Sequence, residues 1–175
     1  SMVSGAGPEQ HGITSNGWER DDHILPPVTT DMEDIFPTIF GVARTQRPAL
    51  EIGAIYHWGG FGRLIEQSAL NKEENPADEN ATAQAVVNYV KDKKPGFLFV
   101  HLDHVDHAGH HDGHKTEPYY CSVSVADSLI GNILQATKDA GIYEETAFIV
   151  SADHGGIGYG HGGETIDEIE IPFIV

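Results

Sequence analysis

The sequence predicts an α/β fold, a mostly parallel sheet sandwiched between helices. Three observations support this prediction: near-continuous apolar runs, amphipathic helical stretches between them, and clusters of acids and histidines directly after two of the runs. Near-continuous apolar strands are typical of parallel sheets that are buried on both faces, and strand–helix–strand alternation favours parallel strands. The length of 175 residues fits about one domain.

The first half of the chain is expected to contain helices, one strand and long irregular segments. In order, the pattern predicts a helix from Thr30 or Asp31 to about Ala43, a strand over 50–56, a short helix over about 62–68, a polar surface loop over 71–80 and a helix from about Asp78 to Lys93. Pro37 falls inside the first of these helices, and a proline fits only the first turn of a helix. The pattern therefore leaves the start of that helix open.

The second half carries the stronger periodicity. The pattern predicts a buried strand over 97–102, a helix from about Pro118 to Ala140, a second buried strand over 146–151 and a last strand within 168–175. The long helix is predicted from apolar residues spaced four and three apart: Tyr119, Val123, Ala126, Ile130 and Ile133. In parallel sheets, ligand sites form beyond the carboxyl ends of the strands, where both acid and histidine clusters fall.

The composition excludes some kinds of partner. The formal net charge is -17, which argues against a nucleic acid polymer or an anionic membrane surface as the ligand. No apolar stretch approaches the ~20 residues of a membrane span. The single cysteine, Cys121, excludes an intrachain disulfide and leaves the redox compartment and the oligomeric state open.

The first cluster contains Asp106 and His110, four residues apart. If these residues form a helical turn, both side chains project to one side and can bind one metal ion. Zinc accepts carboxylate oxygen and imidazole nitrogen alike. The alternative is a solvated, histidine-rich loop. The neighbouring His107, His111 and His114 could support the ligands or face the substrate, but the pattern favours a solvated loop for each of them.

The second cluster, Asp153 and His154, directly follows an apolar run and precedes two glycines. A sharp glycine turn at a strand end can direct two adjacent ligands to one centre. The alternative is a turn acid beside an incidental histidine. His161, flanked by glycines, gains weight as a ligand only because the other two clusters lack enough ligands of their own.

Taken together, these motifs resemble the alkaline phosphatase superfamily, and within it the type I phosphodiesterase/nucleotide pyrophosphatase branch. The resemblance rests on a Pro-Glu-x-His-Gly-Ile segment at 8–13, an Asp-x-x-Gly-His-x-x-Gly motif at 106–113, an Asp-His-Gly motif at 153–155, a His-Gly pair at 161–162 and a Pro-Phe pair at 172–173. It extends over nearly the whole chain and implies an alkaline phosphatase-like fold.

The resemblance implies a site for two divalent metal ions, taken to be zinc. Asp106, His110 and His161 would hold one ion, and Asp153 and His154 would hold the other. A further Asp ligand and the Ser or Thr nucleophile are expected upstream of Ser1. Residues 1–175 are accordingly interpreted as a single partial catalytic domain, truncated at both ends.

The implied function is metal-dependent hydrolysis of phosphoric esters through a covalent phospho-enzyme. The substrate is expected to be a small anionic phosphoester, either a phosphomonoester, a phosphodiester or a nucleotide pyrophosphate. Two alternatives stay open: a non-catalytic metal-binding fragment or degenerate homologue, and a sulfatase of the same superfamily. The resemblance also implies export to the periplasm or the extracellular space.

Overall fold

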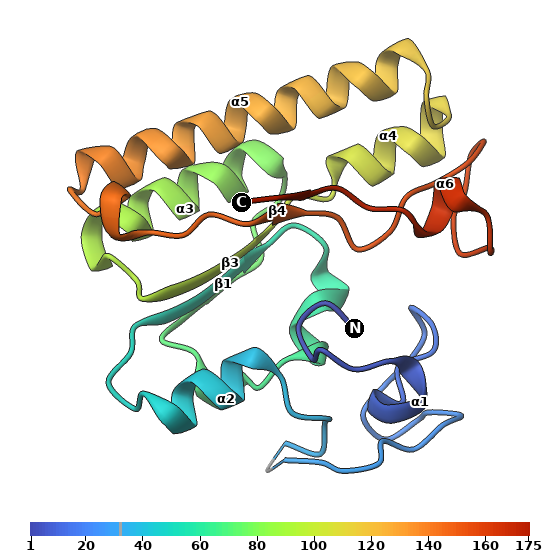
Figure 1. Ribbon diagram of the computed structural model, residues 1–175, viewed down its shortest axis with the longest axis horizontal. Helices are drawn as coiled ribbons and strands as arrows, with labels where there is room; N and C mark the ends of the chain where they lie inside the picture. The colour runs from blue at the N-terminus through green and yellow to red at the C-terminus, as the bar shows by residue number, and fades with distance from the viewer. Residues whose placement is uncertain (32) are drawn as a thin grey trace. The chain divides into compact units, whose positions relative to one another are not determined.

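The computed structural model describes residues 1–31 and 33–175 (Figure 1). The chain divides into two compact units. The first comprises Ser1–Asn75 and Pro95–Val100, and the second comprises Pro76–Lys94 and His101–Val175. Each unit is described separately below.

The first unit is built around a three-stranded sheet. Its elements are helices α1 (Pro8–His11) and α2 (Ile39–Gln46), strands β1 (Ile52–Tyr56), β2 (Lys72–Glu74) and β3 (Phe97–His101), and two 3₁₀ helices, Gly59–Leu64 and Gln67–Ala69. The last residue of β3, His101, belongs to the second unit. The strand order is β2-β1-β3, and β1 pairs with β2 in parallel, with Gly53 opposite Lys72.

The core of this unit lies between α2 and the sheet. Phe40 of α2 is fully buried with Ile52 and Ala54 of β1. The ring of Phe61 stacks on that of Phe99 at a centroid distance of 4.5 Å, which joins the first 3₁₀ helix to β3. Apolar burial of this kind is the main force holding α2 on the sheet.

The second unit is mostly helical. Its elements are helices α3 (Glu79–Lys93), α4 (His104–Asp112), α5 (Glu117–Asp139) and α6 (Ile166–Ile169), strands β4 (Val150–Ser151) and β5 (Phe173–Ile174), and a 3₁₀ helix, Tyr143–Glu145. The long helix α5 packs against both α3 and α4 (Figure 1). Strands β4 and β5 are antiparallel, with Val150 opposite Ile174.

Several predicted boundaries change in the first unit. The helix predicted from Thr30 or Asp31 begins only at Ile39, because Thr38 caps it by accepting the N–H of Phe40 at 3.2 Å. Residue 32, within the predicted helix, lies outside the described residues. The helix predicted over 62–68 is instead the pair of 3₁₀ helices, and the predicted loop over 71–80 contains β2.

In the second unit, α3 and α5 confirm the predicted helices within one residue at each end. The strand predicted over 146–151 is wrong in extent, because only Val150 and Ser151 pair with a partner strand among the described residues. Strand β3 occupies its predicted place, but all five of its residues are half-buried rather than buried.

No helix in the described part of the chain is both long and apolar enough to cross a bilayer.

A carboxylate network ties two loops of the first unit together. Glu33 accepts the backbone N–H of Ser68 at 2.8 Å and that of Gln67 at 3.0 Å, and it pairs with Arg20 at 3.2 Å. Burial favours the neutral acid, but the hydrogen bonds from Ser68, Gln67 and Arg20 outweigh it, so the pKa of Glu33 lies below its usual value.

We expect Glu33→Gln to lower the free energy of unfolding at neutral pH and to lose this effect in acid. A depressed folded-state pKa gives stability that is present above the unfolded value of about 4.3 and is lost as pH falls through the folded pKa. Urea unfolding from pH 7 to pH 3 measures this. An equal deficit at every pH would contradict the ionic contribution, and Glu144→Gln, at an exposed position, is the matched control.

Candidate metal centre

Helix α4 presents the first pair of candidate ligands. Asp106 lies in its first turn and His110 in its last turn, so the two side chains fall on one face, as the four-residue spacing predicts. His110 Nε2 lies 3.4 Å from Asp106 Oδ2. The helix ends at Gly113, whose φ of 89° turns the chain towards α5.

The second and third clusters meet Asp106. Asp106, His154 and His161 each offer a ligand atom within 4.8 Å of the others, and all three residues are half-buried. His161 Nε2 lies 3.6 Å from Asp106 Oδ1, and the rings of His154 and His161 stack at 3.7 Å between centroids. Within residues 1–31 and 33–175, this is the one group of three such side chains.

Backbone carbonyls orient two of the imidazoles. His110 Nδ1 lies 2.9 Å from the carbonyl oxygen of Tyr159, and His154 Nδ1 lies 2.8 Å from that of Gly155. A carbonyl oxygen only accepts, so each Nδ1 carries the proton and donates it. In the neutral ring, Nε2 then has a lone pair, which is the arrangement typical of histidines that bind metals.

The residues fit a divalent metal ion. Asp106 Oδ1 is buried and has no hydrogen-bond partner among the described residues, which is costly for a carboxylate oxygen unless a cation neutralises it. The separations of 3.4 and 3.6 Å from Asp106 to the two Nε2 atoms exceed ordinary hydrogen-bond lengths. They lie near the ~3.3 Å that separates tetrahedral ligands held about 2.0–2.1 Å from zinc.

The protonation state of His161 agrees with this donor set. Burial lowers the pKa of His161 below its usual value, and the neighbouring His154 lowers it further, against the opposing effect of Asp106. The neutral imidazole that binds metals is therefore favoured. Asp153 lies at the edge of the cluster, with 62% of its side chain exposed and Oδ2 at 3.6 Å from His154 Nε2.

The five predicted ligands lie near one another in the structure. The resemblance groups Asp106 with His110 and His161, and Asp153 with His154. The structure brings His154 to Asp106 and His161, while His110 lies beside Asp106 on α4. All five predicted side chains belong to one compact unit.

Sequence reasoning missed Glu168, which holds the loop that carries the two late histidines. Its carboxylate accepts the N–H of Gly163 at 2.7 Å and the hydroxyl of Thr165 at 2.6 Å, and its carbonyl accepts the N–H of Gly155 at 2.8 Å. The hydrogen bonds to its carboxylate, led by that from the Thr165 hydroxyl, lower the pKa of Glu168. The spacing Thr165-x-x-Glu168 is that of a capping box and could have identified it.

The fold and the cluster define a class: an α/β protein with a histidine and aspartate site suited to divalent metals. The family model for type I phosphodiesterase/nucleotide pyrophosphatase matches residues 1–162. The chain therefore belongs to this family, and the resemblance seen in its motifs is confirmed.

Similar proteins agree with this assignment. The chain is 24% identical over 165 residues to ectonucleotide pyrophosphatase/phosphodiesterase family member 3 of Rattus norvegicus. Its fold matches murine ectonucleotide pyrophosphatase/phosphodiesterase 5 with a TM-score of 0.64 at 21% identity, and the human protein of the same name with 0.63 at 20%. The predicted α/β class, with a parallel sheet and flanking helices, is confirmed by this likeness.

The matched proteins are longer than this chain. The match covers 89% of the chain but 19% of the rat relative, and 88% of the chain but 43% of each murine and human structure.

Proposed function

We propose that this chain is part of a hydrolase that cleaves small phosphodiesters or nucleotide pyrophosphates with the help of two divalent metal ions, zinc being the best fit to its donor set. The observation that supports this most directly is the buried, unpartnered Asp106 Oδ1, which lies close to His161 Nε2 in a chain of the phosphodiesterase family. Residues 1–175 would form a single part of the catalytic domain.

The chain's own residues would supply ligands and orientation. Asp106, His110 and His161 would hold one ion, and Asp153 and His154 the other. Bound ions would neutralise the carboxylates, stabilise the attacking and leaving oxygens and lower the pKa of the nucleophile's hydroxyl group. Without such cations, the acidic chain would repel a phosphate group.

We place the nucleophile upstream of Ser1. The hydroxyl of Ser1 lies 3.1 Å from His11 Nε2, which resembles a serine next to a general base. However, His11 Nδ1 accepts the N–H of Ile13 at 3.0 Å, so Nε2 carries the proton and donates to Ser1. Burial also lowers the pKa of His11, which keeps it neutral. His11 is therefore a structural donor and not a base for Ser1.

The relatives indicate the substrate class. An inactive variant of the murine protein has been solved in complex with AMP, and the rat, murine and human relatives are named ectonucleotide enzymes. By analogy, we propose that a nucleoside monophosphate is a product of this site. We also propose that the protein acts outside the cell.

Binding of AMP to the 175-residue chain, with and without zinc, tests the proposal. We expect near-stoichiometric zinc by mass spectrometry, AMP binding by calorimetry only after zinc loading, and no binding of adenosine. Inorganic phosphate should displace AMP at lower concentration than sulfate. Zinc uptake without AMP binding would support a non-catalytic metal-binding protein, and stronger competition by sulfate would support a sulfatase.

An assay on bis(p-nitrophenyl) phosphate tests where the nucleophile lies. With the nucleophile upstream of Ser1, the zinc-loaded chain should bind AMP yet leave this diester intact. Turnover would refute this placement and indicate a nucleophile within the chain, with the hydroxyl groups of Ser1 and Ser4 as the candidates.

A further inference from the structure

The imidazole of His114 fills the space between helix α4 and the loop that carries His154 and His161. Gly109, between the two ligands on α4, and Gly156, between His154 and His161, are both buried. A Cβ atom added at either glycine would overlap with His114 Nε2. The two backbones can approach one imidazole this closely only because both positions are glycine.

His114 also holds the loop by hydrogen bonds. Its backbone N–H donates to the carbonyl oxygen of Gly158 at 2.7 Å, and its Nδ1 lies 3.2 Å from the same oxygen. The ring of Tyr119 lies at 5.3 Å between centroids. With Nδ1 engaged by a carbonyl and Nε2 facing two glycines, the ring is occupied by protein contacts in this arrangement.

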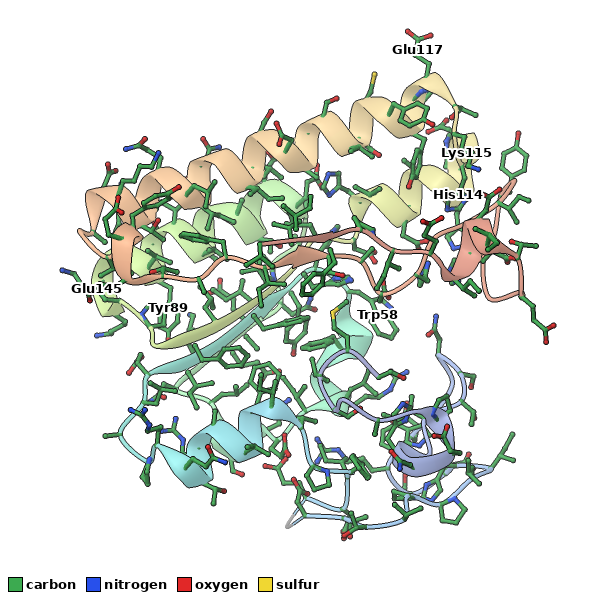
Figure 2. All side chains as sticks on the ribbon, in the orientation of Figure 1. Trp58, Tyr89, His114, Lys115, Glu117 and Glu145 are labelled. Atoms are coloured by element: carbon green, nitrogen blue, oxygen red, sulfur yellow. The ribbon has the colours of Figure 1, made fainter. Side chains whose placement is uncertain are left out.

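We propose that His114 is a positioning residue that fixes the ligand loop on α4 and so brings His154 and His161 to Asp106. This inference rests on the proposed metal-dependent function. The sequence favours a solvated loop for His114, but the structure places it half-buried between the two ligand-bearing segments (Figure 2). The ring acts through the loop and not as a ligand.

The next residue provides a matched control. Lys115 follows His114 in the chain (Figure 2). Its Nζ lies 2.6 Å from Asp167 Oδ1 on α6, and the two side chains are 57% and 42% exposed. An exposed ion pair contributes little and is screened by salt. A change at Lys115 therefore perturbs the same turn and its link to α6 without removing the ring between the two glycines.

The first experiment measures zinc affinity by chelator competition and records the visible spectrum of the cobalt-substituted chain. We expect His114→Ala to weaken zinc binding about 10–100-fold, the range found for residues that orient metal ligands, and to alter the cobalt bands. His114→Asn should recover part of the loss, because its amide can donate to Gly158. Lys115→Gln should stay within about threefold of the parent chain.

A second measurement needs no metal. In the metal-free chain, we expect His114→Ala to speed amide exchange of Ile157 and Gly160 about tenfold, while Gly155, held by Glu168, keeps its rate. Faster exchange in a chain that takes up no zinc would refute the proposed function and leave the role of His114 in place. Unchanged exchange and unchanged zinc affinity would overturn the role of His114 alone.

A double-mutant cycle tests whether the imidazole of His114 fills the space next to Gly156. Gly156→Ala should weaken zinc binding in the parent chain, because the new methyl group displaces the imidazole of His114. The same substitution should reduce zinc affinity much less in the His114→Ala background, where that space is empty. Additive effects would show that the two residues do not act on one another and would overturn the proposal.

Discussion

Asp106→Asn is expected to weaken zinc binding more than any other single substitution in this chain, by roughly 10²–10³-fold. Apparent binding free energies at four-ligand zinc sites are about 10–16 kcal/mol, or about 3–4 kcal/mol for each ligand, and 1.4 kcal/mol is a factor of ten. Asparagine keeps the shape of the side chain but removes the negative charge. Chelator competition at constant pH measures the effect.

Asp106 lies at the centre of the cluster. Oδ2 faces His110 at 3.4 Å, Oδ1 faces His161 at 3.6 Å, and His154 lies within the same cluster. Among Asp106, His110 and His161, the three residues proposed to hold this ion, the carboxylate is the one anion, so its loss would leave two imidazoles to hold a dication.

Asp112→Asn is the matched control for this substitution. It makes the same chemical change on the same helix, but the Asp112 carboxylate pairs with His111 Nδ1 at 2.9 Å. We expect its zinc affinity to stay within about threefold of the parent chain. Equal losses in the two variants would mean that net charge, and not ligation by Asp106, governs zinc uptake.

The local part of this site could be predicted from the sequence. The spacing of Asp106 and His110 is a property of one helical turn, and α4 forms that turn, so both side chains share a face. The long helices α3 and α5 were predicted for the same reason, because periodicity and capping residues act within a few positions of one another.

The grouping of distant residues could not be predicted this way. How closely His154 and His161 approach Asp106 depends on the path of the loop after β4. That path is held by Glu168 and His114, whose partners lie far along the chain or across a turn. Short strands are hard to predict for a related reason. The sequence of Lys72–Glu74 is typical of a polar loop, and the segment forms a strand only because β1 lies beside it.

Phe40→Ala is expected to cause the largest loss of stability, about 3–5 kcal/mol in the free energy of unfolding. Phe40 is fully buried in the core of the first unit, and its ring lies 5.2 Å from that of Phe97 and 6.1 Å from that of Phe99. Removing the ring gives up its buried apolar surface and leaves a cavity, which rigid strands on one side can fill only in part.

Urea unfolding followed by circular dichroism measures this loss, and the neighbouring residue supplies the comparison. Ile39 begins the same helix but is 47% exposed, so Ile39→Ala should stay within about 0.5 kcal/mol of the parent chain. Phe40→Leu should cost less than Phe40→Ala, because leucine refills part of the cavity. If Phe40→Ala and Ile39→Ala were equally mild, the packing of α2 on the sheet through Phe40 would be refuted, since a fully buried ring and a half-exposed side chain cannot contribute alike.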